Sequence, residues 1–164
     1  MFQNGALFDS MSVEQNVAFP LIETGIRDDA DLDSRVREAL KIVRLHGKEK
    51  MMPSELSGGM KKRVALARAI IDRPECICYD EPHAGLDPVT ADTIDKLIKC
   101  LQYDHGITNV VITHDLRSIF RIADRIIFMY NGRIHWQGTC DEIHASNDPI
   151  ITRFIAGSDG DWDN

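Results

Sequence analysis

Two carboxylates stand together at the end of a short apolar segment. Cys76 to Tyr79 reads as a buried strand, and Asp80 and Glu81 follow it directly. Ligands bind at the carboxyl ends of the strands in open parallel sheets. An apolar strand that ends in Asp-Glu is typical of a nucleotide hydrolase, in which the Asp holds Mg²⁺ and the Glu orients or deprotonates the attacking water. The alternative is a pair of ordinary surface carboxylates.

Two further groups could take part in phosphate chemistry. His114 follows a second apolar segment, Asn109–Thr113, so polar residues stand at two expected strand ends. Ser57-Gly58-Gly59 opens an expected helix, where glycines allow close backbone approach and free N–H groups attract phosphate. The alternatives are a structural histidine and an ordinary helix cap.

These residues need an α/β framework. The segment before Pro74 reads as nearly all helix, with Ser12 as an N-cap; from Pro74 onward strands alternate with helices, which implies a parallel sheet covered by helices. The expected helices are Val13–Ala18 (stopped before Pro20), about Asp31–Val43, about Gly59–Asp72, Val89–Gln102 and Ser118–Ala123. A third strand, Arg125–Tyr130, is expected to enter a hairpin at Asn131-Gly132, and residues 158–164 to form a frayed tail.

Composition excludes several classes of protein. The net charge of −7 and the pI of about 5.3 leave no basic nucleic-acid footprint. No apolar stretch approaches the roughly 18 residues that a membrane-spanning helix needs, and no export signal is evident, so a membrane role is expected to come through a partner. Cys76 and Cys78 lack a second pair at metal-ligand spacing and are expected to be buried, reduced core thiols.

Taken together, the motifs resemble those of ABC-transporter ATPases, over residues 1 to 157 and in that family's order. The matching segments are Phe2–Asn4 (Q-loop), Leu56–Met60 (signature), Cys76–Glu81 (Walker B), Ala84–Pro88 (D-loop) and Thr113–Asp115 (switch histidine). The resemblance implies a partial P-loop NTPase (RecA-like) parallel sheet with an α-helical ABC signature subdomain. It further implies three parts: 1–74 for the Q-loop and helical signature subdomain, 75–157 for the C-terminal part of the RecA-like catalytic core, and 158–164 for a disordered tail.

The resemblance also implies ATP and Mg²⁺ as cofactors. Gln3 would then touch Mg²⁺ and the attacking water, and Asp80 would support Mg²⁺. Glu81 would be the general base, and His114 would contact the γ-phosphate.

The remaining roles depend on a homodimer. Ser57, Gly58 and Gly59 would bind the γ-phosphate held by the other subunit, and Asp87 would link the two sites. The other histidines receive no such role and are expected at the surface: His46, His83, His105, His135 and His144.

A closer resemblance is to the ATPases of Mla-type (MCE-associated) phospholipid transporters. It is carried by Phe2–Val13, Asn16–Leu21, Met52–Glu55 and the ending from Gly138 to Gly157. It implies a permease dimer and an MCE-type lipid-binding protein as partners, no nucleic acid, and a place on the cytoplasmic face of the inner membrane. A generic importer ATPase with similar loops is the alternative.

One family motif is absent from these 164 residues. The phosphate loop Gly-x4-Gly-Lys-Ser/Thr occurs nowhere, and Gly47-Lys48-Glu49 lacks both the preceding glycine and the hydroxyl. We therefore expect a truncated gene model, a fragment or half of a split protein. Two functions remain open: an ATPase subunit, and a noncatalytic paralogue that keeps the permease-facing helices. A third class, the ABC proteins of DNA repair or translation, is disfavoured because its members need insertions or tandem cassettes, which are absent from these 164 residues.

The missing loop leads to a prediction. Without its backbone N–H groups and its lysine, the 164-residue chain should bind ATP poorly. Isothermal titration calorimetry with Mg-ATP checks this, and micromolar affinity of the isolated chain would refute it.

Overall fold

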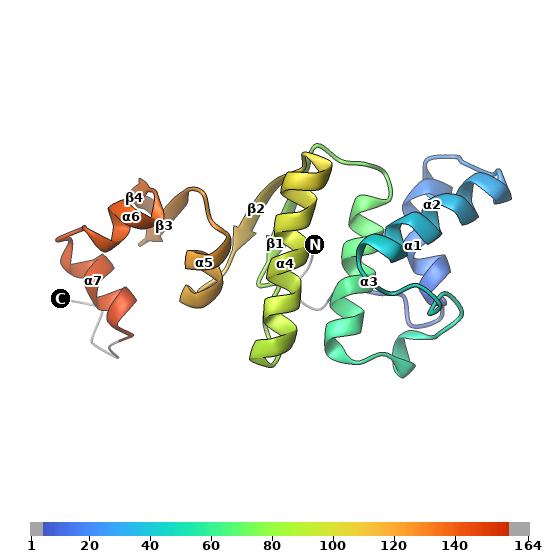
Figure 1. Ribbon diagram of the computed structural model, residues 1–164, viewed down its shortest axis with the longest axis horizontal. Helices are drawn as coiled ribbons and strands as arrows, with labels where there is room; N and C mark the ends of the chain where they lie inside the picture. The colour runs from blue at the N-terminus through green and yellow to red at the C-terminus, as the bar shows by residue number, and fades with distance from the viewer. Residues whose placement is uncertain (1–4, 158–164) are drawn as a thin grey trace. The chain divides into compact units, whose positions relative to one another are not determined.

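The computed structural model describes residues 5–157, which form two compact units divided between His114 and Asp115 (Figure 1). Gln3 and the expected tail, residues 158–164, lie outside the described residues. The sequence analysis divides the chain by motif, with a boundary between residues 74 and 75. The two compact units do not test that division, which stays a prediction.

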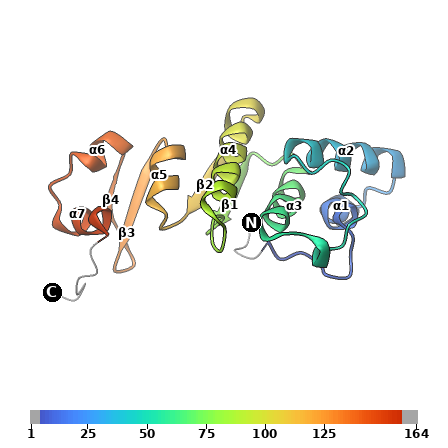
Figure 2. The same ribbon diagram turned by 60° about the horizontal axis from the view of Figure 1, so that its bottom comes forward.

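The N-terminal part of the first unit is a group of helices, α1 (Val13–Glu23), α2 (Asp29–Ile42) and α3 (Gly58–Ile70), with a 3₁₀ turn at Pro53–Glu55 (Figure 2). These helices share a core of apolar side chains exposed by 7% or less: Val13, Val17, Leu21, Val36, Leu40, Val64 and Leu66. The expected helical character of this part of the chain is confirmed.

Helix α1 is longer than the sequence predicts. Ser12 is its N-cap, as expected, and forms a capping box with Gln15, but the helix continues through Pro20 to Glu23. A proline inside a helix removes one hydrogen bond to the preceding turn. The last turn is retained because Leu21 is fully buried and the Pro20 carbonyl accepts from Thr24 N–H at 3.1 Å. The prediction that Pro20 stops the helix is therefore wrong.

The second part of the first unit is a two-stranded parallel sheet, β1 (Cys76–Asp80) and β2 (Thr108–Ile112), joined by helix α4 (Pro88–His105). Asn109 on β2 donates its Nδ2 to the Ile98 carbonyl of α4 at 3.2 Å, which ties helix to sheet. The expected parallel pairing with a covering helix is confirmed (Figure 1).

The sequence predicts strands that are buried on both faces, but the structure buries only one face. Ile77 and Tyr79 are buried, whereas Cys76 and Cys78 are exposed and in no disulfide, so the prediction of core thiols is wrong. Among residues 5–157, the sheet is covered on one face only, and side chains alternate across a strand. The exposed face is apolar; Val110 and Ile112 are 47% and 60% exposed.

The second unit is built on an antiparallel hairpin, β3 (Ile126–Tyr130) and β4 (Arg133–Gly138), with a bulge at Phe128/Met129. The expected turn at Asn131-Gly132 is confirmed, and both residues have the positive φ that such a turn requires. Helices α5 (Leu116–Ile122), α6 (Cys140–His144) and α7 (Pro149–Ala156) pack on the hairpin around a small apolar core: Ile126, Ile143 and Ile151. No helix among the described residues is long and apolar enough to cross a membrane.

A buried amide holds the segment that leads into α1. Asn16 has no exposed surface, and its Oδ1 accepts from Phe8 N–H at 2.8 Å. Its Nδ2 lies 3.0–3.1 Å from three carbonyl oxygens, those of Phe8, Met11 and Ser12. One side chain thus satisfies four backbone groups of residues 8–12.

Replacement of this amide should destabilise the protein. Asn16→Leu leaves several backbone groups without partners, and we expect a loss of about 1–3 kcal/mol in the free energy of unfolding. Urea unfolding followed by circular dichroism checks this. Glu23→Ala, an exposed change at the end of the same helix, is the control and should stay within about 0.5 kcal/mol of wild type; equal effects of the two changes would contradict the assignment.

Candidate functional site

The parallel register of β1 and β2 brings the expected general base and the expected switch histidine together. Asp80 pairs with Ile112, so Glu81 and the segment Thr113–His114 follow at the same edge of the sheet. His114 Nδ1 lies 2.8 Å from Glu81 Oε1, and Thr113 Oγ1 donates to Glu81 Oε2 at 3.4 Å. The Glu81 carboxylate is therefore held by two residues that lie more than 30 positions away in the sequence.

The backbone of Glu81 is held as firmly as its side chain. Its N–H donates to the Ile112 carbonyl at 2.9 Å, and its carbonyl accepts from Lys62 Nζ at 3.2 Å. Its φ is +44°, in the left-handed region that L side chains rarely adopt. Such strain costs about 1–3 kcal/mol and persists where surrounding contacts enforce it, typically at functional sites.

Lys62 is a further candidate for the site that the sequence analysis missed. Its side chain is 6% exposed on α3 and reaches the two acidic residues at the end of β1. Burial lowers the pKa of the Lys62 ammonium, while the nearby charges of Asp80 and Glu81 oppose that shift. The available signal was helical spacing, since residue 62 lies three positions after Gly59 and shares its helix face.

The signature residues open helix α3. Ser57 is the N-cap, and its Oγ accepts from Met60 N–H at 3.3 Å, so the interpretation as a helix cap holds for this residue. Gly58 is exposed and Gly59 is buried. The cap satisfies only the N–H of Met60, and the N–H groups before it have no partner within the helix, so the start of α3 remains a candidate phosphate contact.

Asp87 is exposed and caps helix α4. Its Oδ1 accepts from the N–H groups of Val89 and Thr90, both at 3.0 Å, and its Oδ2 accepts from Thr90 Oγ1 at 2.5 Å. These hydrogen bonds, that of the Thr90 hydroxyl first, hold the pKa of the Asp87 carboxyl below its usual range. Asp87 is thus an ionised anchor at the start of α4.

A metal site made of protein ligands alone is absent from residues 5–157, since no three His, Cys, Asp or Glu side chains gather there. Mg²⁺ at nucleotide sites is commonly held by one or two carboxylates together with substrate phosphates and water. The exposed Asp80 at the strand end fits that arrangement as a single oxygen donor.

His83 departs from expectation. The sequence predicts a surface histidine, but its side chain is 4% exposed, and its Nε2 lies 2.7 Å from Oδ1 of Asp95, which is 1% exposed on α4. Neither ring nitrogen of His83, nor Asp95 Oδ1, makes a hydrogen bond of normal geometry among the described residues, so the two side chains are in close contact without a well-aligned hydrogen bond between them. Polarity misled the prediction, because a buried histidine can be placed opposite a buried carboxylate. The other four histidines, His46, His105, His135 and His144, are exposed, as expected.

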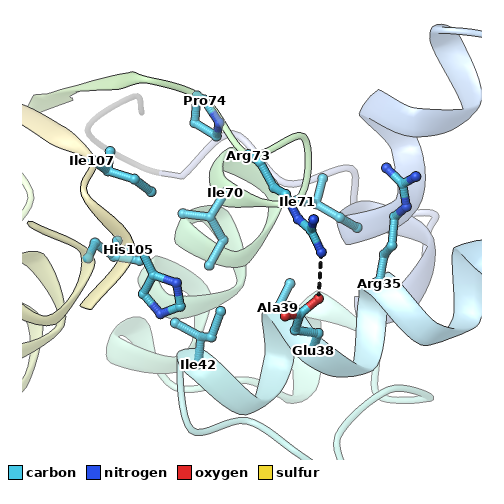
Figure 3. Close-up of a pocket in the computed structure, with 11 residues that line it drawn as sticks. Arg35, Glu38, Ala39, Ile42, Ile70, Ile71, Arg73, Pro74, His105 and Ile107 are labelled. Carbon is cyan, nitrogen blue, oxygen red and sulfur yellow. Dashed lines mark hydrogen bonds and ion pairs between the residues drawn. The ribbon is translucent and has the colours of Figure 1, made fainter.

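A cavity of about 360 Å³ lies elsewhere in the first unit, between α2 and the ends of α3 and α4 (Figure 3). Its walls are polar and apolar in about equal measure, and the Arg73–Glu38 ion pair stands at one side. None of the residues that the sequence singled out for chemistry lines this cavity.

Comparison with known proteins identifies the family. A family model described as ABC transporter matches residues 1–84, just over half of the chain, including the signature and the Asp80-Glu81 pair. The chain belongs to the ABC transporter family. Its α/β fold, with a parallel sheet and packed helices, agrees with the expected P-loop NTPase class.

Individual relatives of this ABC chain refine the comparison. The Arabidopsis thaliana protein TRIGALACTOSYLDIACYLGLYCEROL 3, chloroplastic, is 41% identical over 96% of the chain and 50% of its own length. The Escherichia coli (strain K12) intermembrane phospholipid transport system ATP-binding protein MlaF is 43% identical over 96% of the chain and 58% of its own length.

A solved structure agrees with these relatives. A dimeric, post-hydrolysis form of the ATP-binding cassette MJ0796 bound to ADP and Pi matches 84% of the chain and 60% of its own length, with a TM-score of 0.74 and 33% identity. The ABC chain thus spans only about half to three-fifths of the proteins it matches.

The His83–Asp95 pair gives a prediction about stability. Asp95→Ala removes the carboxylate that lies against a buried imidazole, and we expect a loss of about 1–3 kcal/mol in the free energy of unfolding. Chemical denaturation of Asp95→Ala, His83→Ala and the double variant measures the coupling between the two side chains.

The matched control is Asp92→Ala on the same helix. Asp92 pairs with Lys96 at 2.6 Å, and the two side chains are 31% and 64% exposed, so loss of this pair should cost about 1 kcal/mol or less. Additive effects of the two changes at His83 and Asp95 would show that the pair is not coupled.

Proposed function

We propose that this chain is part of the ATP-hydrolysing subunit of an ABC transporter that drives phospholipid transport through a permease dimer. The observation that supports it most is the arrangement at Glu81, whose carboxylate lies against Thr113 and His114 at the carboxyl end of the parallel sheet. A site for hydrolysis needs a base placed beside the group that contacts the transferred phosphate.

In this proposal each residue has one task. The Glu81 carboxylate accepts a proton from water while the water oxygen attacks the γ-phosphorus and the bond to the leaving oxygen of ADP breaks. His114, which contacts Glu81 and is 80% exposed, contacts the γ-phosphate. Mg²⁺, bound by Asp80 and by Gln3 outside the described residues, would supply charge neutralisation on the phosphates.

The dimer completes the site in this proposal. Ser57, Gly58 and Gly59 present the start of α3 to a nucleotide held by a second copy, and Asp87 takes part in the contact between the two sites. Support comes from the position of these residues at a helix start and from the similar MJ0796 cassette, whose solved structure is a dimer.

The substrate and partners follow from the relatives. The name of the MlaF relative states phospholipid transport, and this supports a lipid cargo. The motif resemblance implies integral-membrane permease subunits and an MCE-type lipid-binding protein as partners. We place the protein on the cytoplasmic face of the inner membrane, bound peripherally through the permease. A noncatalytic module that binds the same permease is the competing proposal.

Removal of the base separates the two proposals. In a form of the protein that also carries a phosphate-binding loop, reconstituted with permease, Glu81→Gln should lower ATP turnover by about 100-fold or more, because the amide cannot accept the proton. ATP binding should persist. Phosphate release and nucleotide retention measure the two effects.

Glu75→Gln is the control, because Glu75 is exposed and directly precedes the first residue of β1, away from the site. This variant should keep turnover. Turnover that survives Glu81→Gln would refute the assignment of the base. Wild-type protein that binds permease and ATP without turnover would favour the noncatalytic module.

A further inference from the structure

The starts of helices α3 and α4 approach each other at a glycine. Gly59 is buried, and a Cβ atom added to it would lie closer than 3.0 Å to Thr90 Cγ2, a separation that real Cβ atoms do not show. One turn earlier on the α4 side, a Cβ atom at Gly58 would meet Leu86 Cδ2 at 3.8 Å, an ordinary contact. Of these two glycines, only Gly59 has to lack a side chain for the Thr90 methyl to lie where it does.

Thr90 has a different partner on each branch of its side chain. Its Cγ2 methyl faces Gly59, and its Oγ1 donates to Asp87 Oδ2 at 2.5 Å. A β-branched side chain occupies few χ1 rotamers on a helix, so the two branches move together. A rotation that withdraws the methyl also withdraws the hydroxyl from Asp87.

We propose that Thr90 is a positioning residue that couples Gly59 to Asp87, so that signature and D-loop meet a partner subunit as one rigid unit. This rests on the proposed function, in which both residues face the second copy. The link lies entirely within one chain: Gly59 sets the place of the methyl, and the methyl sets the place of the hydroxyl that holds the carboxylate.

The titration of Asp87 reports this coupling without any need for hydrolysis. A hydroxyl hydrogen bond stabilises the ionised carboxylate, so loss of that bond raises the carboxyl pKa towards its ordinary value. In the 164-residue chain, carbon-detected NMR titration gives the pKa of Asp87 directly. Thr90→Val, which removes the hydroxyl and keeps a methyl, should raise the pKa of Asp87, and Thr90→Ser should leave it low.

The decisive comparison uses the glycine. Gly59→Ala should raise the pKa of Asp87, because the new methyl forces Thr90 to rotate. Gly59→Ala combined with Thr90→Ser should lower it again, because serine lacks the methyl that clashes. If Gly59→Ala prevents folding, the double variant must restore a dispersed spectrum. An unchanged pKa of Asp87 in Gly59→Ala, or no restoration by Thr90→Ser, overturns the proposal.

Asp148 is a reference within each sample. It is the N-cap of α7, and backbone N–H groups of Ile150 and Ile151, together with His135, hold the pKa of its carboxyl below the usual range. Its pKa should be the same in every variant, whereas a general loss of structure would raise both. The coupling and the proposed function can fail separately. If the double variant restores the low pKa of Asp87 but the protein never hydrolyses ATP, the coupling stands and only the proposed function is refuted.

Discussion

The parallel pairing of β1 with β2 is the constraint on which the candidate site depends. The register from Cys76 opposite Thr108 to Asp80 opposite Ile112 ends both strands at the same edge. Parallel strands need a crossover between them, and α4 with its flanking loops supplies it here. A shift of one residue would turn side chains to the other face of the sheet and separate Glu81 from His114.

Contacts from the parallel sheet and from helix α3 hold Glu81 in an unfavourable conformation. The sheet supplies the Ile112 carbonyl and the switch segment, and α3 supplies Lys62, whose ammonium binds the Glu81 carbonyl from a buried position. These contacts offset the cost of a left-handed φ at a residue with a side chain. The helical group and the sheet thus meet at Glu81, where Lys62 of α3 binds the backbone just after β1.

Prediction succeeded where the chemistry of a short segment decides the outcome. Ser12 and the Asn131-Gly132 turn were predicted because a cap or a turn depends on a few neighbouring residues. Prediction failed where burial depends on distant packing. Cys76 and Cys78 lie in an apolar run typical of a strand covered on both faces, yet one face is open among the described residues; His83 was judged by polarity, yet it is buried against Asp95.

The sequence by itself determined the motifs, their order and the α/β class, because these reside in residue types and local spacing. Tertiary structure decided which of those residues meet: Glu81 with His114, Lys62 with the Glu81 carbonyl, and Gly59 with Thr90. These contacts join residues that are 19 to 33 positions apart. Their geometry depends on strand register and on the close approach of two helices, and neither is encoded in any single segment of the chain.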